Sequence, residues 1–135
     1  MTSVSKTFLL LLFFWISTVK LFAQDSFAEQ FNLAKKLYNE ENYFDAITEF
    51  KRLLFFDDGD AYSYESNLLT GLSYKNGAKF SEAIQHLTLA ELVSKNIDQV
   101  FISRLEMIKI NILRRTTDRA LTLLDSLHND SRFVN

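Results

Sequence analysis

Apolar residues along this chain recur at steps of three and four from about residue 26 to residue 127. That spacing places them on one face of an α-helix, whereas a half-buried strand would alternate at every second residue. The pattern breaks at short links, which fall near residues 40–42, 57–60, 77–79, 94–98 and 114–116. The sequence therefore predicts an all-α chain of six helices without a sheet.

The helical region repeats itself with a period of 37 residues. Residues 43–53 align with residues 80–90 after one period and with residues 117–127 after two. Alanine recurs in register at Ala46, Ala83 and Ala120. Because a small side chain lets two helix axes approach closely, these positions predict close helix crossings.

Each repeated helix has a helical partner just upstream, expected at residues 25–39, 61–76 and 99–113. The links within a pair are only a few residues long, so the two helices are expected to form an antiparallel hairpin. Gly77 is expected to end the middle partner helix in the left-handed conformation, and Gly71 to mark a close contact within it. The alternative is a plain six-helix bundle in which the spacing of the alanines is coincidental.

The repeated residues resemble the signature of the tetratricopeptide repeat family. In the second unit they are Gly71, Tyr74, Phe80, Ala83, Leu87 and Ala90, and in the first Ala34, Leu37, Tyr43, Ala46, Phe50 and Leu53. The third unit matches in part, because Ile108 replaces the small residue and Asn111 the aromatic one. The chain departs from the family pattern in its 37-residue period, its lack of proline, and the polar residues Gln30 and Asn67 at the usual tryptophan position. The resemblance implies a right-handed α-α superhelix, a short solenoid of three hairpins over units of about 27–60, 64–97 and 101–134.

For function, the resemblance implies partner binding without catalysis. Stacked hairpins of this family form a concave groove, lined mainly by the first helix of each unit, which binds an extended peptide or a protein segment. Transferred position by position, the groove residues are Phe31, Lys35, Tyr38, Asn39, Leu68, Leu72, Lys75, Asn76, Leu105, Lys109 and Ile112. For the three leucines the alternative is burial under neighbouring helices. Phe31, Lys35 and Leu72 stand where carboxylate-binding members of the family carry a particular Lys/Asn set, so a C-terminal carboxylate is not the expected ligand.

The first 23 residues have the order of a secretory signal peptide. Lys6 supplies the basic start, Phe8–Ile16 is an unbroken apolar run, and Ala23 is the small residue at the expected cut. A membrane-spanning helix needs about 20 apolar residues, and Lys20 interrupts this segment. The sequence thus predicts export of a mature chain, residues 24–135, to the periplasm or the exterior. The alternatives are an uncleaved membrane anchor over residues 7–23 and a buried core helix.

Composition and charge narrow the chemistry that this chain could perform. The sequence has no cysteine, so disulfides and thiolate sites are excluded, and 15 Lys+Arg against 17 Asp+Glu leave no basic excess for a nucleic acid. Three scattered glycines cannot form a phosphate-binding loop, and His86 and His128 lie outside any metal-binding motif. We therefore expect no enzyme, no cofactor, no small-molecule substrate and no nucleic-acid partner.

Two apolar features point to interaction surfaces. Phe55 and Phe56 are expected to pack against the following hairpin, with an exposed contact site as the alternative. The outer face of the last hairpin is expected to include Ile110, Leu113 and Leu123, and a bare apolar patch marks a docking surface or self-association. The sequence thus favours an exported scaffold that binds a protein or peptide of the cell envelope. The alternative is a structural assembly piece that stacks or self-associates through its C-terminal hairpin.

Overall fold

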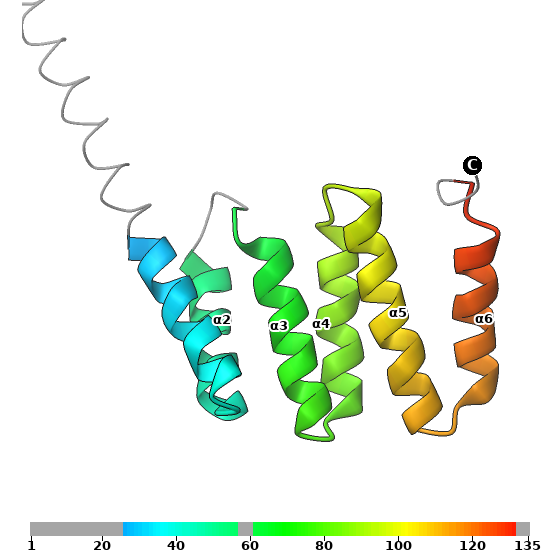
Figure 1. The fold of residues 1–135 in the computed structure, drawn as a ribbon, viewed down its shortest axis with the longest axis horizontal. Coiled ribbons are helices and arrows are strands. Elements are labelled where there is room, and N and C mark those ends of the chain that lie inside the picture. Colours follow the sequence, from blue (N-terminus) through cyan, green and yellow to red (C-terminus); the bar gives the residue numbers. More distant parts are fainter. Residues whose placement is uncertain (1–25, 57–60, 132–135) are drawn as a thin grey trace, which may run out of the picture.

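The computed structural model describes residues 26–56 and 61–131, and the regular secondary structure within these ranges is entirely helical (Figure 1). A first helix, described over residues 26–39, precedes the labelled helices. These are α2 (Tyr43–Phe56), α3 (Ser63–Asn76), α4 (Phe80–Leu92), α5 (Ile97–Leu113) and α6 (Thr117–His128). The all-α prediction is confirmed. The expected signal segment, residues 1–23, and the link at 57–60 lie outside the described residues.

Successive helices pack side by side in chain order (Figure 1). Helix α3 packs against both α2 and α4, and α5 packs against both α4 and α6, whereas no Cα atom of α2 comes within 8 Å of one in α4. One buried cluster forms around Phe50 between the first hairpin and α3, and a second forms around Leu87 between α4 and α5. The core is thus built at the contacts between consecutive helices. No helix among residues 26–56 and 61–131 is both long and apolar enough to cross a membrane.

The turn inside each hairpin recurs with the predicted period. Glu41, Ala78 and Arg115, which are 37 residues apart, are the three non-glycine residues with positive φ in the described chain, at 59°, 57° and 59°. In the first turn Glu41 N–H donates to the Tyr38 carbonyl (3.0 Å) and Asn42 N–H to the Leu37 carbonyl (2.9 Å). The same two bonds recur one and two periods later. This pairing is the Schellman motif, which satisfies the last carbonyls of a helix.

The left-handed residue of the middle turn is Ala78, so the expectation for Gly77 was wrong. Gly77 has φ −80°, an ordinary right-handed value, and its neighbour Ala78 takes the left-handed position. The period of the turn, rather than the nearest glycine, sets which residue adopts that conformation. The start of α5 also differs from the prediction, because the Asn96 side chain accepts the Gln99 N–H at 3.0 Å and caps the helix two residues earlier than expected.

Small residues allow the close helix crossings that the repeat predicts. Ala46 and Ala83 have no exposed surface and Ala120 is 5% exposed. Gly71 lies against α4 so closely that an added Cβ would sit 2.9 Å from Leu87 Cγ and 3.1 Å from the Ala83 carbonyl oxygen. The expectation that Gly71 marks a close contact is therefore confirmed.

Polar residues connect the two helices of a hairpin at the position where the family signature has tryptophan. Gln30 Nε2 donates to Glu49 Oε2 at 2.9 Å, and one period later Asn67 Oδ1 lies 3.1 Å from His86 Nδ1. Burial, and then the charge of Lys51, lowers the pKa of His86. The imidazole is thus neutral at pH 7, and a hydrogen bond to Asn67 is available in its neutral form.

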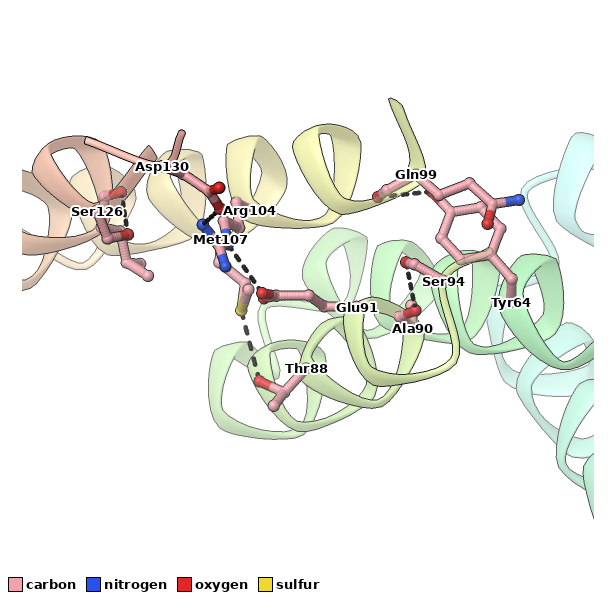
Figure 2. Close-up of polar contacts among 11 residues, drawn as sticks. Tyr64, Thr88, Ala90, Glu91, Ser94, Gln99, Arg104, Met107, Ser126 and Asp130 are labelled. Carbon is pink, nitrogen blue, oxygen red and sulfur yellow. Dashed lines mark hydrogen bonds and ion pairs between the residues drawn. The ribbon is translucent and has the colours of Figure 1, made fainter. Parts of the chain in front are cut away.

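The third hairpin is tied to the second by a partly buried arginine, Arg104 on α5 (Figure 2). Its Nε lies 2.8 Å from Glu91 on α4, and its Nη1 lies 3.1 Å from Asp130, just beyond α6. The Tyr64 hydroxyl on α3 also donates to the Gln99 carbonyl at the start of α5, at 3.1 Å. These contacts fix α5 relative to three other segments of the chain.

The apolar surface of the last hairpin differs from the expectation. Ile110 is fully buried and Leu123 packs inward onto the Leu87 cluster, whereas Leu113 is exposed as expected. The apolar residues that α6 leaves open are Leu121 and Leu124, at 54% and 51% exposure. Phe55 and Phe56 are also exposed, at 80% and 59%, with their rings edge-to-face at 4.9 Å. The expected packing of this pair on the next hairpin was wrong.

Candidate partner-binding groove

The residues predicted to bind a partner lie on the first helix, α3 and α5, which ion pairs join into one face. Lys35 on the first helix pairs with Glu65 on α3 at 2.8 Å. Lys75 on α3 pairs with Glu106 on α5 at 2.6 Å, and Lys109 reaches the other oxygen of Glu106 at 2.6 Å. All three predicted groove lysines are therefore paired. We call the surface formed by the first helix, α3 and α5 around these ion pairs the lysine face.

Glu106 is the centre of charge on the lysine face. Burial acts to raise the pKa of this carboxyl, but the hydrogen bonds and charges of Lys109 and Lys75 outweigh it, and the net effect lowers the pKa. The carboxylate is therefore ionised at neutral pH. Burial, followed by the influence of Tyr43 and Glu106, raises the pKa of Tyr38. Its hydroxyl keeps its proton and remains a hydrogen-bond donor.

Several predicted residues are available to a ligand on this face. Asn39, Asn76 and Ile112 are exposed, and Ile112 retains 59% of its surface. Tyr38 is half-buried, with its ring edge-to-face against Tyr43 at 5.8 Å. Together they offer two amides, a phenol and an apolar side chain on neighbouring helices.

Other predicted residues support the face from below. Phe31 is only 6% exposed, stacks on Tyr62 at 4.8 Å and carries the Lys35 ammonium 5.6 Å above its ring. Leu68, Leu72 and Leu105 are half-buried, and the first two pack against the core clusters. The alternative of burial under neighbouring helices thus holds in part for these leucines. The prediction that Phe31 lines the groove was wrong, because its ring is buried against Tyr62.

Sequence reasoning missed the two acidic residues that neutralise the lysines. Glu65 follows Lys35 by 30 residues and Glu106 follows Lys75 by 31, slightly less than one period. An opposite charge recurring at this offset was the available signal. With its lysines already paired, the face suits hydrogen bonding and apolar contact more than the capture of a free carboxylate.

No cluster of histidine, aspartate or glutamate side chains suited to a metal ion occurs among residues 26–56 and 61–131. Comparison with protein-family models, with curated proteins and with solved structures finds no match for this chain.

Proposed function

We propose that this protein is an exported helical-repeat scaffold of the tetratricopeptide type, which binds a segment of a partner protein and performs no catalysis. In this proposal the hairpins stack as a right-handed superhelix, and the lysine face lines its concave side. The recurrence of the turn at Glu41, Ala78 and Arg115 supports a true repeat, because unrelated helices would not share both its period and its hydrogen bonds.

The observation that carries the binding proposal is the arrangement of exposed and paired side chains on one face. Lys35–Glu65 and Lys75–Glu106 pair across adjacent helices, and Lys109 pairs with Glu106 within α5, so the charged groups of this face are already partnered. Asn39, Asn76 and Ile112 remain exposed among them. A face with free amide and apolar groups suits an extended segment, whose backbone needs hydrogen bonds and whose side chains need apolar contact.

Co-purification with a variant of the lysine face tests this function. Asn76→Glu combined with Ile112→Glu changes two exposed residues outside the ion pairs, so the fold should keep its stability to within about 0.5 kcal/mol. The tagged wild-type protein should recover a polypeptide from envelope extracts that the double variant loses about tenfold or more. Gln85→Glu, on an exposed site of α4, is the matched control and should retain it. Equal recovery by all three proteins would contradict the proposal.

A second candidate function is assembly through the open face of α6. Leu87 and Phe50, the residues one and two periods before Leu124, are fully buried in clusters that include residues of α5 and α3 respectively. Leu124 and Leu121 are half-exposed because no described helix follows α6. This face is thus shaped to receive one more helix of the same kind.

The outer face of the first helix, at the other end of the stack, is not apolar like the open face of α6. Residues of the first helix that correspond to the buried Ser66, Leu69 and Ser73 of α3 are polar and exposed, namely Glu29, Asn32 and Lys36. Head-to-tail stacking of identical copies is therefore disfavoured, and pairing of two α6 faces is the form of self-assembly that remains. Light scattering should show a dimer that Leu121→Glu with Leu124→Glu dissociates. A monomer unchanged by that variant would contradict this second function.

A further inference from the structure

A groove runs between α2 and α4, formed by different residues from those of the lysine face. The Cα atoms of α2 and α4 stay more than 8 Å apart, and side chains of α3 line the space between the two helices. One hollow of about 440 Å³ is lined by α2, the end of α3 and the start of α4, and an adjoining hollow of about 370 Å³ continues along α2. Lys51 lines both hollows. We call this surface the α2/α4 groove.

The side of the α2/α4 groove formed by α2 carries large apolar side chains that are exposed to solvent and are not part of the buried core. Phe44 and Phe55 each keep 80% of their surface and stand at opposite ends of this side, and Ile47 and Leu54 lie between them. Leu89, at 40% exposure, faces them from α4. Large aromatic rings left in water beside a hollow are a sign of an interaction surface.

The equivalent position one repeat later shows whether the fold itself requires these exposed side chains. The related hollow between α4 and α6, of about 320 Å³, has the same place in the repeat. One period after Phe44 and Lys51 stand Ser81 and Thr88, two small polar residues. Since Ser81 and Thr88 occupy the equivalent positions of the next repeat, the fold does not require an aromatic ring or a lysine at these positions.

Charge indicates what the α2/α4 groove would bind. Lys51 and Lys79 line it, and the structure records no ion pair for either among the described residues. None of the described residues that line the two hollows is an aspartate or glutamate. The contrast with the lysine face is direct, because there every predicted lysine already has a carboxylate partner.

We propose that the α2/α4 groove binds a segment of a partner protein in which aromatic or aliphatic side chains alternate with carboxylates. The apolar side chains would enter the hollows beside Phe44 and Phe55, and the carboxylates would pair with Lys51 and Lys79. Helix α2 has 14 residues and is therefore about 20 Å long, which matches about six residues of extended chain. This site is independent of the partner bound by the lysine face.

The test is a selection of random dodecapeptides displayed on phage, using the wild-type protein and the variant Phe44→Ser with Lys51→Thr. The variant carries the residues that the next repeat has at these positions, and both sites are exposed, so its melting temperature should stay unchanged. Peptides enriched on the wild-type protein should be acidic and rich in Phe, Trp or Leu. Their affinity, measured by fluorescence anisotropy, should fall about tenfold in the variant and weaken with salt.

The matched control separates this site from the lysine face. Asn76→Glu with Ile112→Glu should bind the selected peptides as the wild-type protein does, whatever its effect on the proposed envelope partner. Peptides without acidic residues, or equal binding by the Phe44→Ser, Lys51→Thr variant, would overturn the proposal. A third outcome would also overturn it, in favour of a lipid surface: no peptide is enriched, but the wild-type protein alone sediments with vesicles of phosphatidylcholine and phosphatidylglycerol.

Discussion

Replacing each of two glycines by alanine should change the stability of this protein in opposite directions. Gly71 and Gly77 lie six residues apart, one inside α3 and one just after it. At Gly77 an added Cβ would make ordinary contacts, with nearest atoms at 3.6 Å, and φ is −80°, which alanine adopts freely. At Gly71 the same methyl group would lie 2.9 Å from Leu87 Cγ, and Leu87 is fully buried.

The magnitudes follow from backbone entropy and from packing. Gly77→Ala restricts the unfolded chain without strain, so it should stabilise the fold by about 0.4–1 kcal/mol. Gly71→Ala gains about 1 kcal/mol of helix propensity. It must also displace Leu87 or the Ala83 carbonyl, and overpacking of this kind costs about 1–3 kcal/mol. The net result should be a loss of about 1 kcal/mol, which leaves the two variants about 2 kcal/mol apart.

Urea unfolding followed by circular dichroism at 222 nm measures both variants against the wild-type protein. The midpoint should rise for Gly77→Ala and fall for Gly71→Ala, with little change in the slope. If Gly71→Ala were as stabilising as Gly77→Ala, the close approach of α3 to α4 would not exist and the proposed repeat register would fail with it.

Three further predictions concern the turn, the helix crossing and the lysine face. Ala78→Gly should raise the free energy of unfolding by about 0.5–1 kcal/mol and so raise the urea midpoint, because glycine adopts the left-handed conformation without a Cβ clash. A lower midpoint would mean that this conformation is absent. Ala83→Leu should destabilise the fold by about 1–3 kcal/mol through overpacking, whereas Lys79→Leu, at an exposed site, should cost less than about 0.5 kcal/mol. Equal effects of the two variants in the same assay would contradict the repeat register. Glu106 has a lowered pKa in the fold, so the stability that it contributes is present above its unfolded pKa and is lost as the pH falls through the folded value. In urea titrations between neutral and acid pH, Glu106→Gln should flatten that loss, and an unchanged pH profile would show that its ion pairs contribute nothing.

The period of the chain made much of the fold predictable. Helical spacing of apolar residues and the three alanines in register predicted the helices and the turns within the hairpins, because small residues at a crossing are a direct consequence of helix packing. The left-handed turn residue was harder to place. Two of its three positions hold Glu41 and Arg115, residue types that do not favour the left-handed conformation. At the third position, Ala78, the neighbouring glycine was wrongly predicted to adopt it.

The sequence predicted which lysines lie on the lysine face but not the glutamates that pair with them. Asn39 and Asn76 lie one period apart and Ile112 lies one period after Lys75, and all three predicted positions are exposed. The pairing of the lysines depends on how far adjacent helices are offset along their axes, which the spacing of apolar residues within each helix does not fix. The α2/α4 groove was missed for a related reason: the exposure of Phe55 depends on where the next hairpin begins to pack, and nothing in the sequence of α2 specifies that.

Site-specific photo-crosslinking in the producing cells tests the central proposal most directly. A benzoylphenylalanine residue replaces Asn76 or Ile112 on the lysine face in two variants, and Gln85 on α4 in the control, all three being exposed positions. Irradiation should join a discrete partner polypeptide to the protein from both positions on the lysine face and not from Gln85. No partner at Asn76 and Ile112, or the same products from all three positions, would contradict binding by the lysine face.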